Sequence, residues 1–93
     1  MQQNSQAEKA LGYQQITSLS AATALTIPSG CTMALIQPEA QAVRWRDDGT
    51  DPTASVGYPL AVGTELQYTA AQLSKVKFIE QTASAKLNIV YYG

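Results

Sequence analysis

The sequence predicts a small all-β domain, an antiparallel β-sandwich of jelly-roll-like or Greek-key type with a short polar N-terminal arm. Two observations predict this class. Apolar and polar residues alternate in several short runs, as they do in strands with one buried face. Turn-forming clusters separate these runs at intervals of about 8–12 residues, a spacing typical of sandwiches and barrels. The length of 93 residues allows one domain with a hydrophobic core.

The N-terminal segment, residues 1–12, differs from the rest because it is polar and has no strand-like alternation. We expect either a flexible tail or an arm that orders on a neighbouring subunit. Within it, residues 5–11 have the sequence of one or two helical turns, with Ser5 as the cap and Glu8 three residues later. The β-sandwich domain is then expected to cover residues 13–93.

The first two strands are expected at residues 24–27 and 31–36. Pro28-Ser29-Gly30 lies between them and favours a turn, so the pair predicts a hairpin. Pro38 either ends the second of these strands or marks a sheet edge, because proline has no N–H to donate to a ladder.

The later strands are predicted by alternation or by extended sequence around turn signals. They cover residues 42–46, 57–62, 65–68, 75–78 and 85–92. Alternation places one set of apolar side chains toward the core in three of these strands: Val43, Trp45, Leu66, Tyr68, Val76 and Phe78. The last strand carries large side chains on both faces, with Leu87, Ile89 and Tyr91 on one and Asn88, Val90 and Tyr92 on the other. Either a partner covers one of these faces, or one face is core and Tyr92 is exposed.

Composition argues against most catalytic chemistry. The chain has no His, so it has no imidazole base or imidazole metal ligand, and its single Cys excludes an internal disulfide. We therefore expect no enzyme activity, no cofactor and no metal. Six basic residues against seven acidic ones leave no basic face for nucleic acid. The chain also lacks a run of about 20 apolar residues that could span a bilayer, and we expect no signal peptide.

The turn after residue 46 contains three carboxylates, Asp47, Asp48 and Asp51. They could bind a hard cation, but their spacing differs from that of an EF-hand, and a structural turn is the simpler interpretation. Arg44 and Arg46 precede this turn on one strand face. They could pair with these carboxylates within the chain, or with carboxylates of another subunit.

Aromatic residues supply the remaining candidates. Trp45 fits the core, although an indole face could also stack on a sugar. Tyr58 and Tyr92 fit an interface better than the core, because tyrosine combines a rigid apolar ring with a polar tip. The candidate residues of an oligomer or capsid interface are therefore Arg44, Arg46, Asp47, Asp48, Tyr58, Val90 and Tyr92.

Residues 42–53, AVRWRDDGTDPT, followed by Gly57-Tyr58-Pro59-Leu60, carry a recognisable pattern. So do Lys77-Phe78-Ile79 and the final strand that ends in two tyrosines. Over residues 13–93 the chain resembles small structural proteins of tailed bacteriophages, of the capsid-decoration, cement or head-fibre type. The resemblance carries no catalytic signature.

This resemblance implies a non-enzymatic virion protein, made in the cytoplasm of a bacterial host. It implies self-association, with a trimer favoured, and contact with the major capsid protein or another virion protein. The alternative is a tail-associated module that binds a receptor or a carbohydrate. The expected partners include neither nucleic acid nor a membrane.

Overall fold

The computed structural model describes residues 9–69 and 73–93. These residues form eight strands and no helix, which confirms the all-β prediction, and so they include no helix that could cross a membrane. The strands are β1 (Ala10–Ile16), β2 (Thr23–Ala24), β3 (Met33–Glu39), β4 (Val43–Arg46), β5 (Tyr58–Leu60), β6 (Leu66–Thr69), β7 (Lys77–Glu80) and β8 (Lys86–Tyr92).

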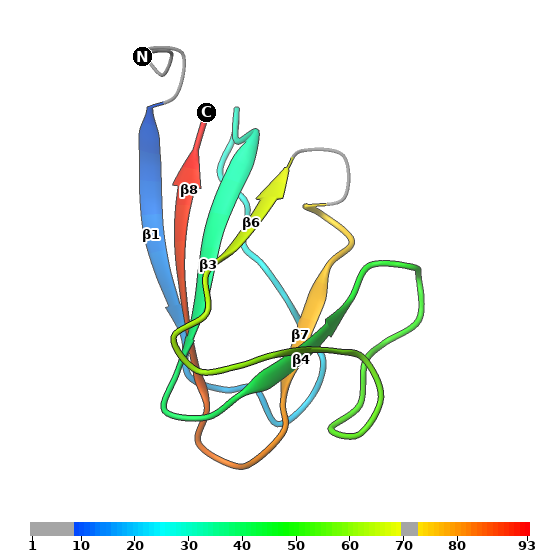
Figure 1. Cartoon of the computed structure of the whole chain (residues 1–93). Coiled ribbons are helices and arrows are strands. Elements are labelled where there is room, and N and C mark those ends of the chain that lie inside the picture. Colours follow the sequence, from blue (N-terminus) through cyan, green and yellow to red (C-terminus); the bar gives the residue numbers. More distant parts are fainter. Residues whose placement is uncertain (1–8, 70–72) are drawn as a thin grey trace.

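The strands form two four-stranded antiparallel sheets in a sandwich-like arrangement (Figure 1). Sheet I has the order β1-β8-β3-β6, and sheet II has the order β2-β7-β4-β5. The first half of the chain pairs with the second half in reverse: β1 with β8, β2 with β7, β3 with β6 and β4 with β5. Two further pairings, β3 with β8 and β4 with β7, complete the sheets.

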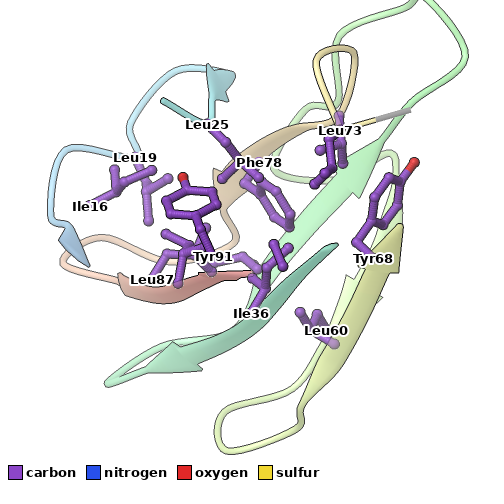
Figure 2. Close-up of a cluster of buried hydrophobic side chains, with 14 of the residues drawn as sticks. Ile16, Leu19, Leu25, Ile36, Leu60, Tyr68, Leu73, Phe78, Leu87 and Tyr91 are labelled. Carbon is purple, nitrogen blue, oxygen red and sulfur yellow. The ribbon is translucent and has the colours of Figure 1, made fainter. Parts of the chain in front are cut away.

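The core lies between the inner faces of the two sheets (Figure 2). The three inward residues of β8, Leu87, Ile89 and Tyr91, are buried, which shows which face of the last strand meets the core. Alternation also placed other residues correctly, since Val43, Tyr68 and Phe78 in the strands and Val76 just before β7 are all buried. Trp45 and Leu66 are half-buried and pack against the margin of this core.

The hairpin expected over residues 24–36 is wrong. A turn does form, with the Cys31 N–H donating to the Pro28 carbonyl at 3.2 Å and Gly30 at φ +81°. However, β2 pairs with β7 in sheet II, whereas β3 pairs with β8 and β6 in sheet I. The turn therefore carries the chain from one sheet to the other, which a local turn signal cannot distinguish from a hairpin.

The domain also starts earlier in the chain than the expected boundary at residue 13. Strand β1 starts at Ala10, so residues 10–12 belong to the sheet, and the helical turns expected over residues 5–11 do not extend to Ala10 and Leu11. Lys9 and Gly93 exchange two backbone hydrogen bonds, of 2.7 and 2.9 Å, which extend the pairing of β1 with β8. The tail or arm expected over residues 1–8 lies outside the described residues.

Pro38 lies inside β3, at a point where one side of the strand is open. It pairs with Leu87 of β8, but β6 ends its pairing with β3 at Ile36. The Pro38 carbonyl accepts the Gly63 N–H at 3.0 Å on the other side. Because the N and C=O of a strand residue point to the same side, the missing N–H of Pro38 faces this open side and disrupts no ladder bond.

The same substitution, valine to alanine, at one buried and one exposed position tests which residues form the core. Val43 is fully buried and Val62 is 52% exposed. Val43→Ala should lower the free energy of unfolding by about 2–3 kcal/mol, because it removes two buried methyl groups and leaves a cavity. Val62→Ala should change it by less than about 0.5 kcal/mol. Urea unfolding of both variants measures the difference, and equal losses would contradict the assignment of the core.

Candidate functional site

Three aromatic rings meet where the sandwich ends, on strands from both sheets. Trp45 of β4 packs on Tyr58 of β5 with ring centroids 5.2 Å apart and on Tyr68 of β6 edge-to-face at 5.6 Å. The register of sheet II places Trp45 opposite Tyr58 and Phe78, so these rings share the inner face. The aromatic cluster thus links the edge strand of sheet II to the edge strand of sheet I.

Tyr58 is exposed although it lies on the inner face. Its strand has three residues and forms the edge of sheet II, so no further strand covers it. The ring is 65% exposed, whereas Tyr68 is buried. Beside Tyr58 lies an open hollow of about 610 Å³. We call it the Tyr58 hollow, and its lining is Trp45, Arg46, Asp47, Asp48, Val56, Gly57, Tyr58 and Pro59.

The carboxylates of the acidic turn each have a different partner. Asp48 accepts two hydrogen bonds from Arg46, from Nε at 3.0 Å and from a terminal nitrogen at 2.6 Å. Asp47 accepts a hydrogen bond from the Tyr68 hydroxyl, across the two sheets. Asp51 accepts one from Lys77 Nζ at 3.0 Å. These contacts match the interpretation in which the turn is structural and Arg46 pairs within the chain.

These contacts also shift the ionisation of the groups involved. The bidentate hydrogen bonds from Arg46 lower the pKa of Asp48 and in turn raise that of the guanidinium. Burial, and then the hydrogen bond to Asp47, raise the pKa of Tyr68 well above its ordinary value. Figure 2 shows Tyr68 at the margin of the core with its hydroxyl directed away from it. Asp47 and Tyr68 therefore hold the acidic turn against sheet I.

Arg44 fixes the loop that precedes Tyr58. Its Nε donates to the Ala54 carbonyl at 3.1 Å, and a terminal nitrogen donates to the Gly57 carbonyl at 2.8 Å. Gly57 has φ +148°, and a Cβ added there would lie 3.1 Å from the Cβ atoms of both Arg44 and Pro52. Only glycine brings this loop so close to β4, and the loop then presents Val56 at the rim of the hollow.

A second surface lies on the outer face of sheet I. In β3 and β8, the buried residues alternate with half-buried apolar ones that point outward. The register brings Tyr13, Val90 and Leu35 into one row and Tyr92 and Met33 into the next. We call these five residues the outer patch. Tyr13 is 62% exposed and the other four residues are half-buried, and Gln67 of β6 contacts the patch at Met33 with its Nε2 3.0 Å from Sδ.

The seven residues proposed as an interface therefore fall into separate groups. Arg46, Asp47, Asp48 and Tyr58 line one hollow, and Arg44 supports the loop beside it. Val90 and Tyr92 lie on the outer face of the other sheet. The sequence interpretation did not name six residues of these surfaces as candidates: Tyr13, Met33, Leu35, Val56, Gly57 and Pro59. Alternation within residues 31–36 could have indicated Met33 and Leu35, whereas the other four depend on strand pairing and loop path.

Comparisons with known proteins found no matching family model, no matching curated protein and no matching solved structure.

The contact between Tyr68 and Asp47 predicts a loss of stability in alkali. The folded pKa of Tyr68 lies above the ordinary tyrosine value, so the free energy of unfolding should fall as the pH rises through about 10. Tyr68→Phe should cost about 1 kcal/mol at neutral pH and should reduce this alkaline loss. Burial raises the pKa of Tyr91 to about 12, so Tyr91 should still cause part of the alkaline loss of stability in this variant. Urea unfolding from neutral to alkaline pH measures both effects; an unchanged alkaline slope in the variant would contradict this role of Tyr68.

The loop constraint at Gly57 is tested with two glycine variants. Gly57→Ala should lower the free energy of unfolding by about 2 kcal/mol, because alanine is strained at this φ and crowds Arg44 and Pro52. Gly12→Ala is the matched control, since a Cβ there meets nothing within 4 Å. Thermal unfolding compares the two. A Gly57→Ala variant as stable as the control would show that the loop does not need glycine.

Proposed function

We propose that this chain is a non-enzymatic structural protein of a phage virion, made in the host cytoplasm, that self-associates and decorates or cements the capsid. The observation that carries the proposal is the outer patch, a partly exposed apolar area on the outer face of sheet I. The sequence resemblance to small structural phage proteins suggests that the chain is part of a virion, and it favours a homotrimer. The major capsid protein or another virion protein is the further partner.

The composition of the outer patch supports a protein partner. Tyr and Met are enriched in the centres of protein interfaces, whereas Lys and Glu are depleted there. On the strands of this face the charged side chains are Glu39 and Lys86, which lie opposite each other in the register at the far end. The patch itself is uncharged, so a second copy would bring no like charges against it.

Amide side chains border the patch and could satisfy polar groups at its rim. Asn88 accepts hydrogen bonds from the Tyr13 hydroxyl at 2.6 Å and from Gln15 at 2.9 Å. It also donates to Glu39 at 2.9 Å. An apolar centre with a polar rim is the usual anatomy of an interface.

The strand order supports a finer assignment of the fold within the proposal. Among the eight strands, β1 pairs with β8, β2 with β7, β3 with β6 and β4 with β5. This is the pairing of one long hairpin that has been rolled up into two sheets. We propose that the fold is a jelly roll, an architecture found in viral capsid domains and lectins. The absence of His and the paired carboxylates of the acidic turn support a role without catalysis.

The proposal predicts a stable homo-oligomer whose assembly depends on the outer patch. Val90→Lys should reduce the solution mass to that of the monomer, because a lysine in the centre of an interface loses its hydration. Val56→Lys is the matched control, since Val56 is 55% exposed and lies outside the patch. Light scattering on a size-exclusion column measures the masses, and circular dichroism checks the fold.

The outcomes separate assembly from the identity of the interface. A wild-type chain that is monomeric at every concentration would overturn self-association. An oligomer that survives Val90→Lys would overturn the outer patch as the interface. Antibody labelling of phage particles that contain the chain should mark the head, and label confined to the tail would instead favour the receptor-binding alternative.

A further inference from the structure

We propose that the Tyr58 hollow binds a neutral pyranose sugar. Sugar rings present a face of C–H groups that packs on an aromatic ring, and a ring of hydroxyl groups that needs hydrogen-bond partners at its edge. Tyr58 supplies an exposed aromatic face, and the same hollow carries the polar atoms of Arg46, Asp47 and Asp48. Its volume of about 610 Å³ falls within the range of small-ligand sites. This inference does not depend on the proposed virion role.

The aromatic face is fixed in place before any ligand arrives. Tyr58 packs on Trp45, which in turn packs on buried Tyr68. Pro59 follows Tyr58 and restricts the backbone, and Arg44 holds the carbonyl of Gly57 directly before it. A preorganised ring loses little conformational entropy when a ligand stacks on it.

The polar groups of the hollow are also oriented. The two hydrogen bonds between Arg46 and Asp48 fix the plane of the carboxylate. An ionised carboxylate can accept about four hydrogen bonds, so Asp48 has acceptor capacity left for sugar hydroxyls. Asp47 accepts a single hydrogen bond, from the Tyr68 hydroxyl, which holds one of its two oxygens. A pair of adjacent hydroxyls on a pyranose fits such in-plane acceptors.

The charge of the hollow selects a neutral ligand. Its lining contains two carboxylates, Asp47 and Asp48, and one guanidinium, Arg46, so its formal charge is −1 (two negative groups less one positive). This charge opposes uronic acids, sialic acids and phosphorylated sugars. The remaining lining side chains, Val56 and Pro59, are apolar and fit the C–H surface of a sugar.

Trp45 provides a direct signal for binding. It is the only Trp of the chain, so its fluorescence has a single source. Within the described residues, its Nε1–H is the one buried side-chain polar group without a hydrogen-bond partner. A ligand that packs on Tyr58 changes the surroundings of this indole and should shift its emission.

The test titrates the full chain with glucose, galactose, mannose, N-acetylglucosamine and their disaccharides. Glucuronate is titrated in parallel as an anionic sugar for comparison. We expect a saturable change in Trp45 emission for at least one neutral sugar at millimolar concentration, and saturation-transfer NMR signals from that sugar. Glucuronate should bind more weakly. The absence of both signals for every neutral sugar would overturn the proposal. Tighter binding of glucuronate than of the neutral sugars would overturn the inference that the ligand is neutral.

Three variants locate the site. Tyr58→Ala should weaken binding about tenfold, the effect of losing one stacked ring. Tyr58→Phe should bind as the wild type does, since it retains the ring and shows that the fold tolerates the position. Val62→Ala is the control, because Val62 is exposed and lies outside both the Tyr58 hollow and the outer patch. Equal losses in Tyr58→Ala and Val62→Ala, or no loss in Tyr58→Ala, would overturn the assignment to the Tyr58 hollow. A failure here leaves the oligomer mass unchanged, so it is distinguishable from a failure of the proposed function.

Discussion

The pairing of β8 with both β1 and β3 is the interaction on which the rest of the structure depends. Strand β8 contributes Leu87, Ile89 and Tyr91 to the core, and it lies between β1 and β3 in sheet I. Sheet I therefore cannot form until the last residues of the chain return to the first. Such pairings are distant in sequence, and because forming them costs loop-closure entropy, we expect slower folding than in helical domains of similar size.

Local alternation was sufficient to predict the class of the fold and the buried face of most strands. Val43 and Phe78 show why: one face of each of their strands meets the core, so the period of two is imposed by burial. Partner choice was not predictable in this way. The turn at Pro28 to Gly30 has the same local chemistry whether the chain doubles back or crosses to the other sheet, and only the long-range pairing of β2 with β7 decides between them.

The candidate site was predictable in part. Its residue types, an aromatic pair beside arginines and carboxylates, were visible in one stretch of sequence, and Arg46 with Asp48 forms the pair that proximity suggests. The role of Arg44 was not visible, because its acceptors are backbone carbonyls of a loop whose path depends on Gly57. The exposure of Tyr58 was expected from its residue type, but its cause lies in the sheet order, which leaves β5 at an edge. The outer patch likewise needed the register that aligns Tyr13, Val90 and Leu35.

The two proposed surfaces lie on different sheets, so one can be occupied without blocking the other. A further consequence follows from the two backbone hydrogen bonds between Lys9 and Gly93. These positions lie side by side at one end of sheet I (Figure 1), so a short linker could join them without distorting β1 or β8. A chain in which residues 9 and 93 are joined and new ends are opened in a surface loop should therefore keep both sheets.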